Sequence, residues 1–291
     1  MTGISDGCTW ADDDRVARWL RHAADIEYQH APVSDVLFAA AELQPGERVL
    51  DVGCGTGPIA RRAAREVGPA GRVTGLDISA DMIAAAAARE PDQGAAALDW
   101  VTADAVTWEP GDRTVDVVMS RFGVMFFSAP AVAFTTLAAV TRPGGRLAMV
   151  VWARRDECDL FTVPLNAALD ELHRRGVSVD LPPGDEGAFS LHDPDTVTAL
   201  LTATGWSGIR CTPHRLSLHF RRSMDPASAA AAVLDCGPTR LVSDQLHADA
   251  DRAAVTNAIA AAFAKHLDGA GHLRLDAKIL LITADRPSSA R

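Results

Sequence analysis

The sequence of 291 residues predicts an α/β fold built on a doubly wound, mostly parallel sheet. Two observations predict this fold. Short apolar strand candidates alternate with helical stretches between about residues 47 and 152, and a glycine-rich turn follows the first strand. Such alternation is typical of βαβ units, in which helices cover both faces of a parallel sheet. A ligand is then expected beyond the carboxyl ends of the strands, where the glycine turn falls.

Residues 45–152 form the predicted core, with five strands and three connecting helices. Apolar and β-branched runs mark the strands, and alanine-rich segments mark the helices. The strand candidates are Arg48–Val52, Arg72–Asp77, Leu98–Ala103, Val115–Ser120 and Arg146–Trp152, and the helices are Ile59–Val67, Ser79–Arg89 and Ala131–Thr141.

Residues 1–44 precede the core and are predicted to form an N-terminal helical cap. Arg15–Tyr28 and Ser34–Leu43 are interpreted as two helices, the second with apolar residues at helical spacing. The polar residues up to Asp14 have the composition of a loose end. We expect this cap to fold over the ligand site.

After Trp152 the alternation breaks, and residues 153–271 are predicted to form a helical lid with late core elements near residues 193–220. The segment Leu181-Pro182-Pro183-Gly184-Asp185 interrupts this region. A helix is expected to begin at Asp193-Pro194, because Asp suits the N-cap and Pro the first turn. The remaining predicted elements are strands near Ile209–Thr212 and Leu216–Phe220, a largely helical stretch from Asp225 to Leu267, and, within residues 272–291, the last core strand Ala277–Thr283 followed by a tail.

Composition excludes several classes of function. A net charge of -10 without clustered Lys and Arg argues against a nucleic-acid partner. Five scattered cysteines without a C-x-x-C pair suggest neither a zinc site nor a disulfide framework, so we expect no metal. No leader is recognised, and no run approaches the roughly 18 apolar residues of a membrane span. We therefore expect a soluble cytoplasmic protein.

The stretch Val49-Leu50-Asp51-Val52-Gly53-Cys54-Gly55-Thr56-Gly57 carries the strongest functional signal. A buried strand enters a turn with three glycines, and a helix follows. Glycines lack a Cβ and tolerate positive φ, so a ligand can approach the backbone closely. The N-terminus of the following helix offers free N–H groups to that ligand.

A carboxylate at the end of the second strand suits the ribose of a nucleotide-like cofactor. Asp77 lies about 20 residues after Gly57, and an acidic side chain there can accept hydrogen bonds from ribose hydroxyls. The alternative is a helix N-cap, but Ser79 already suits that role. Dinucleotide-binding proteins use G-x-G-x-x-G, whereas Pro58 stands here in place of the third glycine. Nicotinamide binding is therefore disfavoured.

The chain resembles the class I S-adenosylmethionine-dependent methyltransferases, most closely the ubiquinone/menaquinone-biosynthesis group and related small-molecule enzymes. Five segments carry the resemblance in order: Val49–Gly57, Gly75–Ser79, Thr102–Ala105, Asp116–Phe122 and Arg142–Leu147. The resemblance implies a Rossmann-like sheet of seven strands whose last hairpin is antiparallel. It also implies S-adenosyl-L-methionine as the methyl donor and S-adenosyl-L-homocysteine as the product.

The resemblance also implies a set of cofactor-binding residues. The turn from Asp51 through Gly53, Cys54, Gly55 and Gly57 would face the methionine part and the ribose. Asp77 would hold the ribose hydroxyls, Ile78 and Met82 would lie near the adenosine, and Asp104 and Ala105 would bind the adenine. The Ser120 carbonyl would lie near the ammonium or sulfonium, with Phe122 beside the cofactor. For Asp104 a solvated loop position is the alternative.

The expected function is methyl transfer to a small, lipophilic acceptor, such as a secondary metabolite or a quinone-like molecule. If the acceptor is a phenol or enol, a general base would help, and His30 and Tyr28 in the cap are the weak candidates. Two alternatives stay open: a cyclisation or rearrangement on the same fold, and a non-enzymatic cofactor-binding protein. A homodimer is also left open.

Overall fold

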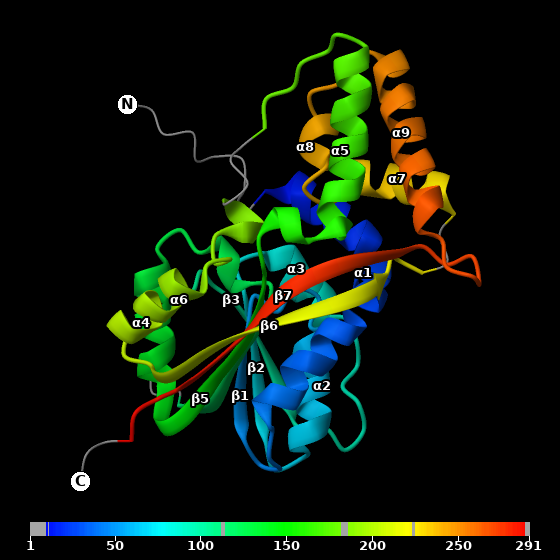
Figure 1. Cartoon of the computed structure of the whole chain (residues 1–291). Coiled ribbons are helices and arrows are strands. Elements are labelled where there is room, and N and C mark those ends of the chain that lie inside the picture. Colours follow the sequence, from blue (N-terminus) through cyan, green and yellow to red (C-terminus); the bar gives the residue numbers. More distant parts are fainter. Residues whose placement is uncertain (1–9, 11, 112–113, 182–185, 223–224, 289–291) are drawn as a thin grey trace.

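The computed structural model describes residues 10, 12–111, 114–181, 186–222 and 225–288 (Figure 1). Within them, seven strands form one sheet in the order β3-β2-β1-β4-β5-β7-β6. Strands β1 to β5 pair in parallel, and β7 runs antiparallel to both β5 and β6. The predicted seven-stranded, mostly parallel sheet is therefore confirmed. The strands are β1 (Arg48–Val52), β2 (Arg72–Asp77), β3 (Ala97–Thr102), β4 (Val115–Arg121), β5 (Thr141–Trp152), β6 (Ser207–His219) and β7 (Arg274–Asp285).

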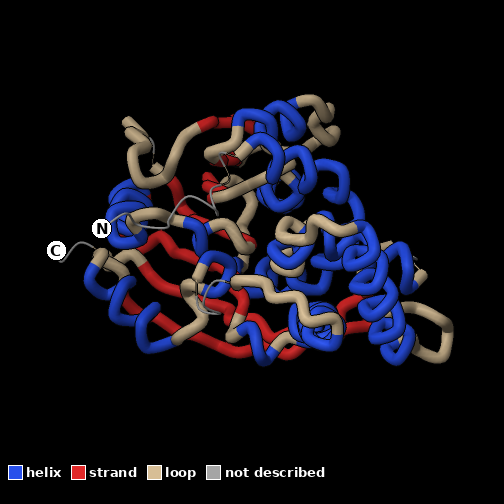
Figure 2. Tube along the Cα trace, turned by 90° about the horizontal axis from the view of Figure 1, so that it is seen from above, coloured by secondary structure: helices blue, strands red, loops and turns tan. Residues whose placement is uncertain are grey.

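Helices cover both faces of the sheet, as in a doubly wound fold (Figures 1 and 2). Helices α1 (Asp13–Ala41), α2 (Pro58–Val67) and α3 (Ala80–Ala87) lie on one side, and α4 (Pro130–Val140) and α6 (Pro194–Ala203) on the other. The central strands are fully buried between them, with Leu50, Val118 and Met149 at 0% exposure. Burial on both faces explains why these strands are continuous apolar runs.

The N-terminal segment forms one helix and not the two that its sequence predicts. Helix α1 runs through Pro32, which lacks the N–H that an interior helical position needs. Buried residues on both sides of the proline, including Ile26, Val33 and Leu37, pack continuously against the protein. Tertiary packing of this face therefore outweighs the local cost of the proline.

The predicted strands near Ile209–Thr212 and Leu216–Phe220 are one strand, β6, with Pro213 inside it. Among the described residues this strand lies at the edge of the sheet, with β7 as its one neighbour. Proline is tolerated on an edge strand, because half of the backbone groups there have no neighbouring strand. The prediction for α6 is confirmed, since the Asp193 carboxylate caps the helix by accepting a hydrogen bond from the Thr196 N–H at 2.9 Å.

Four helices gather above the carboxyl ends of the parallel strands (Figure 1). We call them the lid helices: α5 (Asp159–Arg174), α7 (Pro226–Asp235), α8 (Arg240–Ser243) and α9 (Asp249–Phe263). Short 3₁₀ turns complete the chain at Val124–Phe126, Arg155–Glu157, Gly187–Phe189 and Ala264–His266. The division into cap, core and lid stays a prediction. Residues 1–9, 182–185 and 289–291, which include most of the expected loose ends and the double proline, lie outside the described residues.

Candidate cofactor site

The glycine turn after β1 combines two tightly packed positions with one open position. A Cβ on Gly53 would lie 2.6 Å from the Cα of Gly123, and one on Gly57 would lie 2.3 Å from the Trp100 ring. A Cβ on Gly55 would meet nothing within 4 Å among the described residues. All three glycines have positive φ. The turn therefore presents bare backbone at Gly55 while its two ends are held by packing.

Hydrogen bonds fix this turn against the end of β2. The N–H groups of Gly53 and Cys54 donate to the Leu76 carbonyl at 2.8 and 3.0 Å. Cys54 is buried, and burial raises the pKa of its thiol well above the ordinary range, so the thiol stays protonated. Cys54 therefore takes part in the turn through its backbone.

Asp77, the last residue of β2, faces the turn. Its carboxylate accepts hydrogen bonds from the Gly55 N–H at 2.8 Å and from the Ser79 N–H at 2.9 Å. Burial raises the pKa of this carboxyl, while these N–H donors oppose the rise. Ser79 caps α3 by accepting from the Met82 N–H at 3.3 Å. The expected N-cap is therefore Ser79, and Asp77 is directed to the glycine turn.

Strand β3 brings a second carboxylate to the same edge of the sheet. The Ala103 N–H donates to the Asp77 carbonyl at 2.9 Å, so the ends of β2 and β3 lie together. In the loop that follows, the Asp104 carboxylate accepts from the Val106 N–H at 2.9 Å, and Ala105 is buried. Near this edge, Ile78 is 41% exposed, an unusual position for a large apolar residue, whereas Met82 is buried.

The ends of β4 and β5 form the opposite wall. Ser120 is fully buried, and its hydroxyl donates to the Val52 carbonyl at 2.8 Å, which links the end of β4 to β1. Phe122 has a φ of 64°, a strained conformation for an aromatic residue. Its ring stacks on Trp152 with centroids 4.0 Å apart and planes 11° from parallel. Trp152 was not among the predicted site residues, because only the long-range pairing of β4 with β5 brings it to Phe122.

Asp51 lies beneath the turn with an incomplete hydrogen-bond shell. It is 1% exposed, and its Oδ2 atom has no partner among the described residues. Burial raises the pKa of this carboxyl to about 7, although the Arg121 charge and the Ala60 N–H lower it. A buried carboxylate with a free oxygen suits a cationic ligand group.

The raised pKa of Asp51 gives a prediction for stability. Its folded pKa of about 7 exceeds the ordinary 3.8, so the group's favourable contribution is complete below about pH 4 and is lost as pH rises toward 7. Asp51→Asn removes this loss. At pH 8 the ligand-free variant should exceed the wild type in unfolding free energy by on the order of 2–4 kcal/mol. Urea unfolding at pH 5 and pH 8 checks this, and an equal difference at both values would contradict it.

An ion pair that the sequence did not reveal joins α1 to the site. Arg121, at the end of β4, pairs through both terminal nitrogens with the Glu27 carboxylate and donates to the Ser34 hydroxyl at 2.6 Å. No local pattern connects these residues, which lie 94 and 87 positions apart in the chain. Arg121 therefore holds the N-terminal helix against the end of the sheet.

The two base candidates occupy different surroundings. His30 is buried, and its ring centroid lies 5.1 Å from that of Phe122 and 5.6 Å from that of Trp152. Tyr28 is 43% exposed, and its ring lies 6.2 Å from His219 at the far end of β6. The structure therefore brings His30 to Phe122 and Trp152 and within range of the Arg121 charge, whereas the described ring contact of Tyr28 is with His219.

Neither a metal-binding cluster nor a membrane-spanning helix occurs in the part of the chain that the structure describes. No three His, Cys, Asp or Glu side chains there come together as a metal-binding group. No helix there has the length and the apolar character needed to cross a membrane.

Known proteins resemble this chain in the segment that contains the glycine turn and Asp77. A family model described as a methyltransferase domain matches residues 49–145. An uncharacterized protein of Mycobacterium tuberculosis is 32% identical over 217 residues, 72% of this chain and 76% of that protein. Nocamycin O-methyltransferase of Saccharothrix syringae is 30% identical over 226 residues, covering 76% and 78% of the two chains. A ubiquinone/menaquinone biosynthesis C-methyltransferase of Ruegeria is 38% identical over 112 residues, 38% of this chain and 44% of that enzyme.

The fold also matches solved structures. The YcgJ protein of Bacillus subtilis superposes with a TM-score of 0.55 at 18% identity, over 89% of this chain and 100% of that one. The site suits the cofactor of this family on two observations: the free oxygen of buried Asp51 can meet a cation, and Gly55 leaves the backbone open to a ligand. Together with the relatives that align over 72% and 76% of this chain, these findings show that the chain belongs to the class I S-adenosylmethionine-dependent methyltransferases.

Proposed function

We propose that this methyltransferase acts on a small, lipophilic acceptor, a secondary metabolite or a quinone-like molecule. The observation that carries the proposal is a continuous row of aromatic rings from the end of β4 to the lid helices. Phe122 stacks on Trp152, Trp152 meets Phe161 of α5 edge to face at 5.0 Å, and Phe161 meets Phe189 at 5.2 Å. An acceptor bound along this row would meet aromatic surface, which favours flat, apolar ligands.

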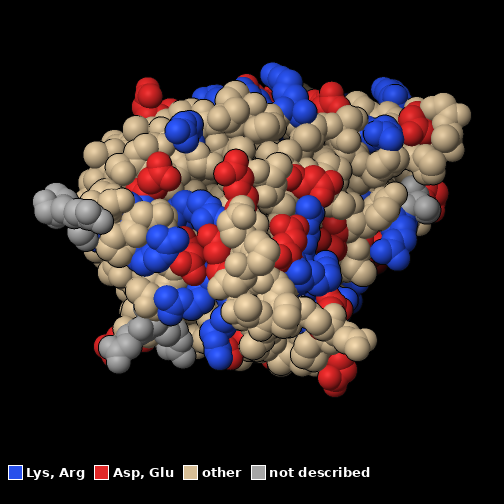
Figure 3. Space-filling model, turned by 90° about the horizontal axis from the view of Figure 1, so that it is seen from below, with Lys and Arg blue, Asp and Glu red and all other residues tan. Residues whose placement is uncertain are grey.

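The names of the relatives and the surface charge support a small-molecule acceptor. Nocamycin O-methyltransferase, which aligns with this chain over 226 residues, is named for a small molecule. Figure 3 shows basic and acidic side chains intermixed on the face opposite the lid helices. Exposed ion pairs of the sheet, such as Arg72 with Asp99 at 2.6 Å, neutralise one another. That face offers no basic stripe for nucleic acid.

We propose the following roles for the residues at the cofactor site. Asp77 binds the ribose hydroxyls, Asp104 and Ala105 bind the adenine, and Ile78 covers it. Asp51 attracts the ammonium, Gly53, Gly55 and Gly57 admit the backbone contact, and the Ser120 carbonyl faces the same end. When bound, S-adenosylmethionine supplies a methyl group on a sulfonium that departs as a neutral thioether. The residues around it need to position the acceptor and exclude water, and good positioning alone can supply about 7–11 kcal/mol.

We propose His30 in preference to Tyr28 as the proton acceptor, because its ring lies against Phe122. Burial, with the charges of Arg121 and Arg221, lowers the pKa of His30 well below its usual range. The imidazole is therefore neutral at pH 7 and able to accept a hydrogen bond from an acceptor hydroxyl, although it is a weak base. Its reach to that hydroxyl is set by α1, which Arg121 holds in place.

A substitution of His30 tests this role. His30→Gln should lower kcat by about 10²-fold or more, the range for loss of general acid–base help, with little change in cofactor affinity. Tyr28→Phe is the matched control on the same helix and should retain activity. Steady-state kinetics with calorimetric cofactor titration give both readouts. Full activity of His30→Gln would remove His30 from the mechanism.

The proposed function is tested directly by incubating the protein with radiolabelled S-adenosylmethionine and a panel of hydroxylated aromatic and quinone-like acceptors. We expect label in a product that is one methyl group heavier, together with S-adenosylhomocysteine. A product of unchanged mass but altered connectivity would support the cyclisation alternative instead. Transfer only to protein or nucleic acid substrates in parallel reactions would contradict a small-molecule acceptor.

A further inference from the structure

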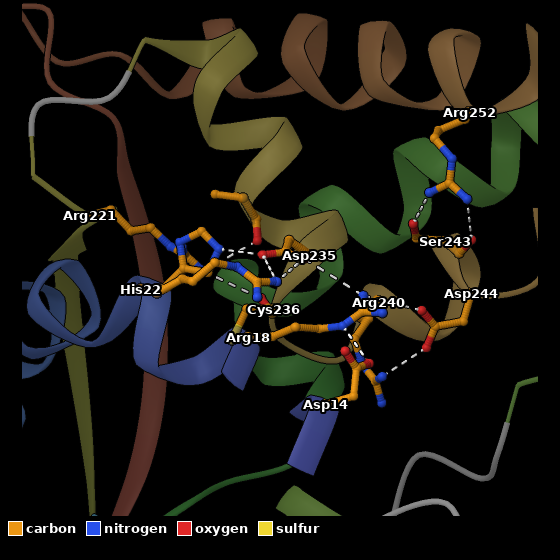
Figure 4. A network of polar contacts seen from close by, with 12 residues as sticks. Asp14, Arg18, His22, Arg221, Asp235, Cys236, Arg240, Ser243, Asp244 and Arg252 are labelled. Atoms are coloured by element: carbon orange, nitrogen blue, oxygen red, sulfur yellow. Dashed lines mark hydrogen bonds and ion pairs between the residues drawn. The ribbon is translucent and has the colours of Figure 1, made fainter. Parts of the chain in front are cut away.

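A network of charged side chains joins α1 to the lid helices (Figure 4). Asp235 at the end of α7 accepts from His22 at 2.8 Å and from Arg21 at 3.0 Å. Arg18 pairs with Asp14 at 2.8 Å, and Arg240 pairs with Asp244 at 3.0 Å. The three arginines each have a carboxylate partner, as expected for charges that are partly removed from water.

Arg221 differs from the other cations of this network. It follows β6, is 4% exposed, and has a φ of 50°. Its Nη2 atom lies 3.4 Å from the carbonyls of Ala232 and Cys236, long distances for hydrogen bonds, and its Nη1 atom has no partner among the described residues. The Cys236 side chain, Asp25 and Asp235 are close enough to influence its charge, but the described contacts include no hydrogen bond from Arg221 to either carboxylate.

Burial of Arg221 with an unpartnered Nη1 is unfavourable unless a ligand supplies a hydrogen-bond acceptor. The buried Nη1 donor has lost its contact with water and has gained no acceptor in return. The strained backbone at Arg221 adds to that cost, and strained residues cluster where ligands are bound. Both features point to an anionic group that meets Nη1 when the site is filled.

His30 lies beside the aromatic row and within range of the Arg221 charge. The charges of Arg121 and Arg221 both act on His30, whose ring faces Phe122 and Trp152. Arg121 is neutralised by Glu27, whereas Arg221 is not bonded to a carboxylate in the described contacts. Gln29 is also buried beside His30, with its Nε2 3.4 Å from the His30 Nε2 and its Oε1 without a partner among the described residues. A free acceptor on Gln29 therefore borders His30, and the free donor belongs to a side chain whose charge acts on the same ring.

We propose that the methyl acceptor carries an anionic oxygen, a carboxylate or an ionised enol, that binds the Nη1 of Arg221, and a neighbouring hydroxyl that donates to the Oε1 of Gln29. This inference rests on the proposed small-molecule function and narrows the substrate class to acidic aromatic or polyketide-like molecules. The aromatic row binds the apolar body, and Arg221 fixes its charged end. Arg221 and Gln29 are then specificity-determining residues.

The experiment uses 3-hydroxy-2-naphthoate and its methyl ester as probes, titrated by calorimetry into the full chain saturated with S-adenosylhomocysteine. The wild type should bind the carboxylate roughly tenfold or more tightly than the neutral ester, as expected for a hydrogen bond to a charged group. Arg221→Met should remove this preference by weakening only the carboxylate, and Gln29→Leu should weaken both probes. Arg222→Met, the exposed neighbour, should leave the preference intact.

Two controls keep the outcomes distinct. Affinity for S-adenosylhomocysteine reports whether each variant is folded, and Arg221→Lys, which keeps the charge, should restore part of the preference if Arg221→Met loses the fold. Equal binding of acid and ester by the wild type, absence of binding by both, or a preference that survives Arg221→Met would overturn the proposal. Failure of the proposed function itself would appear separately, as no binding of S-adenosylhomocysteine.

Discussion

Gly57→Ala is expected to lower the unfolding free energy by about 2–5 kcal/mol, the sum of overpacking and of a left-handed backbone conformation for a residue with a Cβ. The new Cβ would lie 2.3 Å from the Trp100 ring. That ring also lies close over the backbone of Gly75, the residue that pairs with Trp100 across β2 and β3, so the indole has little room to move. The backbone φ of 80° adds its own strain. Urea unfolding of the ligand-free protein measures the effect.

Gly94→Ala is the matched control for this prediction. Gly94 has a φ of 78°, close to that of Gly57, but a Cβ there would meet nothing within 4 Å among the described residues. It should therefore show only the conformational cost, about 1–2 kcal/mol. If Gly57→Ala and Gly94→Ala were equally stable, the tight packing of the glycine turn against Trp100 would be refuted.

Asp77→Ala is expected to weaken binding of S-adenosylmethionine by about 1.5–3 kcal/mol, roughly 10- to 150-fold, the range for losing hydrogen bonds to a charged group. The carboxylate has two tasks: it holds the Gly55 and Ser79 N–H groups, and it is proposed to accept the ribose hydroxyls. Loss of the first task also loosens the turn, so both effects weaken binding in the same direction. Calorimetric titration measures the affinity.

Asp99→Ala serves as the control for Asp77, because Asp99 lies on the neighbouring strand β3 and forms an exposed pair with Arg72. Its removal should leave cofactor affinity unchanged. A change of only a few tenths of a kcal/mol for Asp77→Ala would contradict its proposed ribose contact.

The sequence was sufficient for those parts of the fold that local patterns specify. Strands β1 and β2 begin and end where predicted, because buried apolar runs there are bounded by glycine turns and polar residues. The N-cap roles of Ser79 and Asp193 also follow from residue type and position alone. Local signals failed at Pro32 and Pro213, where helix packing and an edge-strand position override the usual effect of proline.

The site was predictable only in its local part. Gly55 and Asp77 belong to local patterns that predict a ligand site, a glycine turn after one strand and a carboxylate at the end of the next. The structure adds a hydrogen bond from the Gly55 N–H to the Asp77 carboxylate. Contacts between distant segments determine the other features of the site. These features are the ion pair of Arg121 with Glu27, the stacking of Phe122 on Trp152, and the unpartnered Nη1 of Arg221. The pKa of Asp51 likewise depends on how deeply the completed fold buries it, which a strand pattern cannot specify.

The central claim is that the open backbone at Gly55, between Asp51 and Asp77, receives S-adenosylmethionine. Calorimetric titration of the wild type, Gly55→Ala and Gly94→Ala with S-adenosylmethionine tests it most directly, because both substitutions place a Cβ at positive φ in open space but only one lies at the turn. We predict one cofactor per chain for the wild type and Gly94→Ala, and loss of roughly tenfold or more in affinity for Gly55→Ala. Equal affinity of the two variants, or no binding by the wild type, would contradict the account.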